Sequence, residues 1–175
     1  MAEADATKTG PERVEFLLAL VRNLCAIADP DEMIDAELGG TGRCLRASRC
    51  LAELDRSSSF VTVSQPWTDP DAATMPPQLG TCGASDFWME EKWDALDRGP
   101  VGIPDAPTLP SAWTSEGDAS AMCAGAYALA ACRCDGRVVG SIVVTSSQPR
   151  EWKGWDRLLG DASAFVWPLV QRARA

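Results

Sequence analysis

The sequence predicts a single α+β domain in which an antiparallel sheet is combined with helices at both ends of the chain. Three observations lead to this prediction: apolar residues recur at helical spacing near both termini, they alternate with period two in the middle, and an Asp-Gly pair separates two strand-like segments. The chain has 175 residues, of which 46% are hydrophobic. That size suits one core and leaves little for a second.

Two amphipathic helices are predicted at the N-terminal end, after a tail without periodicity. The flexible tail covers residues 1–11. The first helix should begin at Pro11 and end before Asp29. The second begins near Asp31 and is expected to end in the run 39–42, Gly-Gly-Thr-Gly, because glycine weakens a helix interior.

Two strands joined by a polar connection are expected next, because the apolar period changes to two at residue 49. The first covers Arg49–Leu54 and the second runs from Phe60 to about Gln65, which together form a hairpin. Residues 66–85 carry four prolines with glycines and polar residues, so we expect a long irregular loop. Loops of that length are usually functional or mobile.

A helix, a short strand and a poorly formed helix are predicted in the following segment. Phe87–Asp97 contains tryptophans among acidic neighbours and precedes Gly99-Pro100, which predicts a helix and its end. Val101–Ile103 has the apolar character of a short strand. The stretch around Ser111–Met122 is rich in small residues and is expected to form a short, weak helix.

The last third of the chain has the clearest pattern. Ala126–Cys134 and Val138–Thr145 are strand-like, and Asp135-Gly136 between them is the strongest hairpin turn in the sequence. After Arg150, a long helix carries its apolar residues on one broad stripe. Pro168 lies inside that stripe, so we expect a kink near the end of the helix.

The absence of histidine excludes more functions than any other feature of the composition. Without imidazole there is no Ser-His-Asp triad, no Cys-His pair, no HExxH zinc site and no histidine-ligated haem. The chain has 16 basic against 25 acidic residues, a net charge of −9. No basic stripe interrupts this background, which argues against nucleic acid or anionic lipid as a partner. No apolar run approaches the roughly 18 to 20 residues that span a bilayer.

The seven cysteines are expected to be reduced thiols in a cytoplasmic protein. Their number is odd, they lie in apolar segments, and no signal peptide precedes them. Cys132 and Cys134 stand two residues apart on a predicted strand, which separates them by roughly 7 Å. That distance is too long for a disulfide and awkward for one tetrahedral metal, so we expect no metal site.

Several segments together resemble one known family. The stretch 87–110 combines a tryptophan-bearing helix, an Arg-Gly stop, an apolar strand and a Pro-Asp…Leu-Pro loop. Residues 134–144 resemble the central hairpin of GAF domains, and residues 150–159 resemble the start of their last helix. In order and spacing, the chain over about residues 12–173 is similar to GAF sensors of bacterial signalling proteins, relatives of the PAS sensors.

This resemblance implies one GAF domain over residues 12–175. Its sheet would carry helices on both faces, and its N- and C-terminal helices would pack together. It also implies a non-catalytic sensory domain that binds a small molecule over the sheet and forms a homodimer through the terminal helices. The residue set of the cyclic-nucleotide-binding branch is not recognisable. Cys123 is followed by Ala124 rather than by the histidine of bilin-binding relatives.

Candidate ligand contacts come from the tryptophan-rich segments and the central strand. An apolar pocket with a few polar groups is the usual site for a small ligand. Tyr127, the single tyrosine, lies on the strand face opposite Ala126 and Ala128. Arg133 is a further polar candidate on that strand. The predicted ligand-binding residues are Trp67, Trp88, Trp93, Asp105, Trp113, Cys123 and Tyr127.

Each candidate also has a structural explanation. The indoles would then fill the space between sheet and helices, Tyr127 would donate a hydrogen bond to a backbone carbonyl, and Asp105 would stabilise a turn or cap a helix.

Two other functions are also compatible with these residues. One is a dimerisation or protein-interaction module without a ligand, and the other is a cysteine-based redox enzyme that resembles free methionine sulfoxide reductase. The echo of such an enzyme at Thr81-Cys82-Gly83 lacks the neighbouring catalytic sequence, and the sequence names no cofactor.

Overall fold

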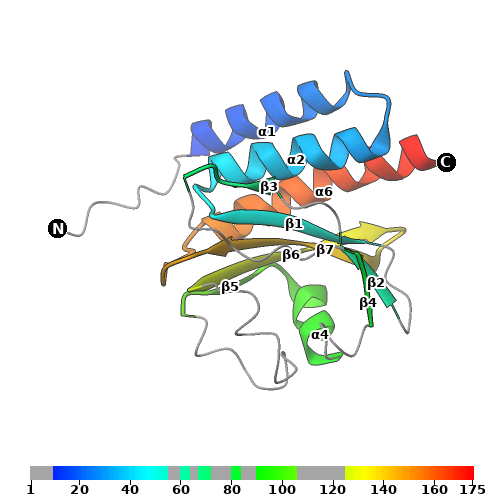
Figure 1. Ribbon diagram of the computed structural model, residues 1–175. Coiled ribbons are helices and arrows are strands. Elements are labelled where there is room, and N and C mark those ends of the chain that lie inside the picture. The colour runs from blue at the N-terminus through cyan, green and yellow to red at the C-terminus, as the bar shows by residue number, and fades with distance from the viewer. Residues whose placement is uncertain (1–9, 55–59, 64–66, 72–79, 84–89, 106–124) are drawn as a thin grey trace.

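A computed structural model describes residues 10–54, 60–63, 67–71, 80–83, 90–105 and 125–175 (Figure 1). Along these segments two helices are followed by four strands, one helix, three strands and a last helix, which is an α+β order. Their bounds are α1 Gly10–Leu24, α2 Pro30–Cys44, β1 Arg49–Leu54, β2 Phe60–Val63, β3 Trp67–Thr68, β4 Gly80–Gly83, α4 Glu90–Arg98, β5 Val101–Ile103, β6 Ala126–Cys134, β7 Arg137–Ser146 and α6 Trp155–Arg174.

Seven strands of the described part form one sheet, in the order β4-β2-β1-β7-β6-β5, with β3 also paired to β1. Every pair is antiparallel. The two predicted hairpins, β1-β2 and β6-β7, are therefore confirmed. The prediction of an irregular loop over 66–85 is wrong for β3 and β4. Both are short strands, because pairing with β1 and β2 outweighs the local composition of this segment.

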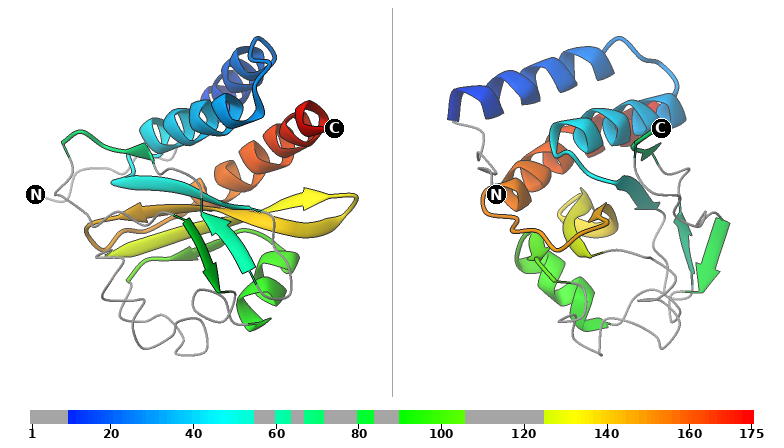
Figure 2. Two further views of the ribbon diagram at one scale, coloured as in Figure 1. Left: turned by 45° about the vertical axis from the view of Figure 1, so that its right-hand side comes forward. Right: turned by 60° about the vertical axis from the view of Figure 1, so that its left-hand side comes forward.

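Helices cover both faces of the sheet, as the sequence predicts. Figures 1 and 2 show α1, α2 and α6 together on one face and α4 alone on the other. We call these the helical face and the α4 face. The predicted packing of the terminal helices is confirmed, since α1 contacts α6 and Arg13 pairs with Asp161 at 2.9 Å. The larger apolar cluster lies between the helical face and these three helices.

Helix α2 does not loosen at its glycines, which corrects the sequence prediction. It continues through Gly42 to Cys44. A Cβ on Gly42 would overlap Cε3 of Trp67, so the indole of β3 occupies the space that a side chain would need. The packing of Trp67 against the glycines of α2 thus outweighs the low helix propensity of these glycines. At the other end, the Asp29 carboxylate caps α2 by accepting bonds from two backbone N–H groups.

The remaining predicted boundaries agree within a few residues. Helix α1 ends at Leu24, before the expected limit, and the C-terminal helix is one element that continues past Pro168 to Arg174. The predicted tail up to residue 9 and the weak helix around 111–122 lie outside the described residues. Among the helices of the described part, none combines the length and apolar character needed to cross a membrane.

Candidate functional site

The α4 face carries side chains in three rows, because antiparallel partners on neighbouring strands point to the same side. The rows follow from the register of β5, β6, β7 and β1. The first row is Ile103, Tyr127, Thr145 and Arg49; the second is Val101, Leu129, Val143 and Leu51; the third is Ala131, Ser141 and Glu53.

The middle row forms the apolar floor of this face. Leu51, Leu129 and Val143 are buried in one cluster with Trp93 and Leu96 of α4. Helix α4 therefore lies over the centre of the face, as Figure 1 also shows. The predicted candidates Trp93 and Tyr127 both belong to this cluster. Ala126 and Ala128 belong to the opposite cluster, which confirms the predicted orientation of β6.

The first row places a cation and two hydroxyl groups side by side in a buried position. Arg49, Thr145 and Tyr127 are 2%, 1% and 4% exposed. The Thr145 hydroxyl has no hydrogen-bond partner among the residues that the structure describes. A buried hydroxyl left unsatisfied costs about 1–3 kcal/mol, so polar groups in such positions normally meet a partner.

The third row adds a buried carboxylate. Glu53 is 3% exposed, and its Oε2 accepts a bond of 2.9 Å from the Ser141 hydroxyl. Arg49 and Glu53 stand four residues apart on β1, which separates them by about 13 Å along the strand. The α4 face thus presents a basic polar row and an acidic polar row with an apolar floor between them.

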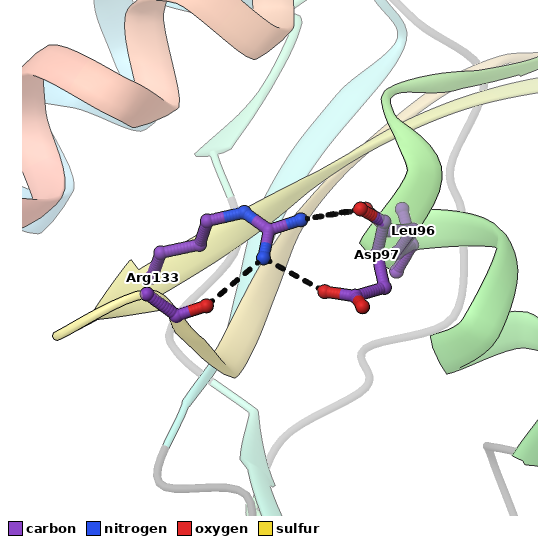
Figure 3. A network of polar contacts seen from close by, with 4 residues as sticks. Leu96, Asp97 and Arg133 are labelled. Atoms are coloured by element: carbon purple, nitrogen blue, oxygen red, sulfur yellow. Dashed lines mark hydrogen bonds and ion pairs between the residues drawn. The ribbon is translucent and has the colours of Figure 1, made fainter.

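Arg133, the further polar candidate, holds α4 to the β6-β7 hairpin. Figure 3 shows its guanidinium directed at the C-terminal end of α4. It donates to the Asp97 carboxylate at 2.8 Å and to the backbone carbonyls of Asp97 and Leu96 at 2.8 and 3.3 Å. A fourth bond reaches the carbonyl of Gly136 in the hairpin turn. A cation at a helix C-terminus satisfies carbonyls that lack partners within the helix. Arg133 therefore positions α4 over the floor.

The other predicted site residues are distributed differently. Asp105 follows β5 and is half-buried. Trp67 packs against α2 and the cluster of the helical face, so it does not share the α4 face with Trp93 and Tyr127. Three further candidates, Trp88, Trp113 and Cys123, lie outside the described residues.

Sequence reasoning missed four polar residues of the α4 face: Arg49, Glu53, Ser141 and Thr145. The signal was present in β1, where charged residues stand at the first and fifth positions of an otherwise apolar strand. A charge inside a buried strand is rare unless it has a partner. The alignment of Thr145 with Arg49 needed the pairing of β1 with β7, which the sequence alone did not supply.

The described cysteines divide into buried and accessible thiols. Cys50 and Cys132 are buried on the helical face, where burial and the nearby Glu37 raise the pKa of both thiols well above the ordinary value. Cys25 is exposed, and Cys44 and Cys134 are half-buried. Within the described residues, no three Cys, Asp or Glu side chains come together in a group that could hold a metal ion.

Glu37 is the most unusual polar group of the helical face. It lies on α2 and is 1% exposed, and its Oε1 has no partner in the described part of the chain. Burial raises the pKa of this carboxyl from 4.5 to about 8. Glu37 belongs to the layer of α1, α2 and α6, which is separated from the α4 face by the sheet.

The layered sheet, with three helices on one face and α4 on the other, defines an α+β domain. The sequence model of the GAF domain matches residues 29–166, which is more than half of the chain. The chain therefore belongs to the GAF domain family. Comparison with curated protein sequences gave no significant match.

Solved structures of GAF proteins share the fold at low sequence identity. The GAF domain of an Acinetobacter phosphoenolpyruvate-protein phosphotransferase has a TM-score of 0.73 at 12% identity, over 95% of this chain and 96% of that chain. Free methionine-R-sulfoxide reductase from Neisseria meningitidis, solved in complex with its substrate, has a TM-score of 0.72 at 12% identity, over 99% and 97%. The chromophore-binding domain of a bacteriophytochrome from R. palustris has a TM-score of 0.75 at 15% identity, over 95% and 64%.

Proposed function

We propose that this GAF domain is a non-catalytic sensor in the cytoplasm that binds a small molecule over the α4 face and signals through its terminal helices as a homodimer. The observation that carries the proposal is the pair of buried polar rows on either side of an apolar floor. Small-ligand sites usually have this composition, a mainly apolar surface with a few polar groups that fix the orientation of the ligand.

The polar rows also indicate what kind of molecule would fit. An arginine has five N–H donors, so the Arg49 guanidinium can donate hydrogen bonds to an anionic or carbonyl group of a ligand in addition to its contacts within the protein. The Thr145 hydroxyl beside it is buried and adds a donor and an acceptor. Glu53 lies about 13 Å from Arg49 along β1 and would attract a hydrogen-bond donor or a cationic group at the other end of the ligand. Because α4 covers the apolar floor between the two rows, we expect an elongated ligand with polar ends and an apolar centre to bind only where α4 makes room for it.

Signalling would follow from the position of α4. Because α4 is held at its C-terminus by Arg133 and lies over the floor, a ligand on this face would favour one position of α4 and shift the equilibrium of the domain. The sheet that carries the ligand on one face supports α1, α2 and α6 on the other. Among the fold neighbours, a substrate complex and a chromophore-binding domain support a binding role for the fold.

The redox alternative is less well supported by the described thiols. A reactive cysteine needs an accessible thiolate, whereas burial raises the pKa of Cys50 and Cys132.

The sensor proposal is tested by native mass spectrometry of the purified protein, before and after denaturation. A non-covalent mass that leaves on denaturation supports the sensor, whereas bare protein under all conditions supports an interaction module instead.

A further inference from the structure

Two arginines share one hollow at the C-terminal end of α2, which we call the arginine groove. Its volume is about 460 Å³, and it is lined by Arg43, Arg46, Ala47, Trp67, Asp69 and Pro70. Two cations and one carboxylate thus line this groove, whereas the whole chain has a net charge of −9. Both arginines are exposed, and neither guanidinium has a hydrogen bond or an ion pair among the residues that the structure describes. Their N–H donors are therefore available to a ligand.

The first arginine lies next to an indole over a glycine of α2. A Cβ on Gly39 would lie 3.2 Å from Nη1 of Arg43 and 3.5 Å from Cδ1 of Trp67, so both side chains approach the helix where it carries no side chain. Trp67 is half-buried, because its six-membered ring packs on Gly42. The rest of the indole lines the groove. Figure 1 shows its strand, β3, beside α2. The groove thus combines an aromatic surface with an adjacent cation.

The second arginine belongs to a turn with a left-handed backbone conformation. Arg46 has a φ of 48°, which is uncommon for a residue other than glycine. Arg150 stabilises the turn, because its guanidinium donates to the backbone carbonyls of Leu45 and Arg46. The N–H of Arg46 donates to the carbonyl of Arg43 at 3.2 Å. Strained backbone that neighbouring contacts maintain is found most often at binding and active sites. These contacts fix the position of Arg46 beside Arg43 at the groove.

We propose that the arginine groove binds a small organic anion in which a flat ring carries an oxyanion, either a phosphate or a carboxylate. The oxyanion accepts hydrogen bonds from Arg43 and Arg46, because a guanidinium matches the oxygens of both groups. The ring stacks on the accessible part of Trp67, since indoles form favourable contacts with flat rings. A volume of about 460 Å³ lies within the usual range of small-molecule sites.

This site is separate from the ligand site of the proposed function. Trp67 packs with the cluster of the helical face, and the sheet lies between it and Trp93 and Tyr127 of the α4 face. The inference therefore goes beyond the sensor proposal, and neither depends on the other. Trp67, which the sequence suggested as a ligand contact, here contacts a different ligand at a different place.

The test is fluorine NMR of the full chain labelled with 5-fluorotryptophan, in which W67F identifies the Trp67 signal. Phenyl phosphate and benzoate are the probes, and the tighter of the two identifies the preferred oxyanion. Inorganic phosphate and phenol each carry one half of a probe. We expect saturable shifts of the Trp67 signal with a probe, and binding at least about tenfold weaker for phosphate or phenol alone, because each makes only one of the two contacts.

Charge variants test the role of the arginines. R43A and R46A should each raise the Kd of the probe about tenfold, because each removes a hydrogen bond from a charged donor. R22A changes an exposed arginine in the last turn of α1 and should leave the Kd unchanged. D69N should lower the Kd about threefold, because it removes a like charge from the groove. Its side-chain oxygen can still accept the bond of 3.1 Å that the Asp71 N–H donates to Asp69.

Three results would overturn the inference. The first is a Trp67 signal that neither probe shifts at about 10 mM, well above the Kd expected for a specific site. The second is inorganic phosphate that binds as tightly as phenyl phosphate, because the ring then contributes nothing. The third is a Kd that R43A, R46A and D69N leave unchanged while their urea midpoints equal that of wild type. The gain expected for D69N distinguishes a binding site from a merely structural role, since damage to the fold does not tighten binding.

Discussion

Replacing Glu37 by glutamine should remove a large pH dependence of folding. The carboxyl lies on α2 and is buried, and burial raises its pKa from 4.5 to about 8. The folded protein therefore binds a proton that the unfolded chain releases above pH 4.5. Glutamine has nearly the same shape and stays neutral, so E37Q keeps the packing and removes the titration.

The sign and size of the effect follow from proton linkage. A raised pKa in the folded state stabilises the protein fully below the unfolded pKa, and this stabilisation is lost as pH rises through the folded pKa. Between pH 5 and 8 the free energy of unfolding of wild type should fall by about 1.4 kcal/mol per pH unit relative to E37Q. The total over the interval from 4.5 to about 8 is roughly 5 kcal/mol. The buried thiols Cys50 and Cys132 do not interfere in this window, because their ordinary pKa is 9.0 and burial raises it.

Urea unfolding at pH 5, 6, 7 and 8 measures the effect directly. E32Q is the matched control, because Glu32 is an exposed residue in the first turn of the same helix. We expect the free energy of unfolding of E32Q to fall with pH as steeply as that of wild type, and that of E37Q to fall less steeply. If the free energies of unfolding of wild type and E37Q change equally with pH across this range, the Glu37 carboxyl is not desolvated in the folded protein. That result would refute the reasoning about the packing of α2 on the helical face.

Two further variants test the packing that positions the site. G42A should lower the free energy of unfolding by about 1–3 kcal/mol, because its Cβ would overlap Trp67. G40A should be neutral or slightly stabilising. Equal effects of the two variants in urea unfolding would contradict this prediction, because they would show that Trp67 moves away freely. R133A should cost roughly 1–2 kcal/mol by loss of the bonds to α4, and D97N less than about 1 kcal/mol, because that ion pair is exposed. Amide hydrogen exchange in α4 should rise with R133A, and unchanged protection would contradict its anchoring role.

Local patterns predicted the parts of the fold that depend on neighbouring residues. The β6-β7 hairpin followed from alternation and from Asp135-Gly136, which adopt the positive φ values of 49° and 78° that this tight turn requires. Strand β1 and strand β5 also have the predicted bounds. Alternation along β6 was enough to assign Tyr127 to the face opposite the alanines.

Features that depend on distant contacts were not predicted. The glycine run of α2 was expected to end the helix, because nothing nearby in the sequence shows that Trp67 packs there. For the same reason Trp67 was grouped with Trp93, although the sheet separates them. The first polar row combines Arg49, Thr145 and Tyr127 from three strands, and the register between strands far apart in the sequence decides which residues meet.

Native mass spectrometry of the purified protein tests the central claim, a small molecule on the α4 face, most directly. T145V removes the buried hydroxyl of the first row, and T41V makes the same change at an equally buried position of α2, on the other side of the sheet. The account predicts an extra non-covalent mass on wild type and T41V that is lost on denaturation and is reduced at least about threefold on T145V, as expected when a ligand loses a hydrogen bond. Bare protein in all three samples, or a bound mass that T145V leaves unchanged, would contradict it.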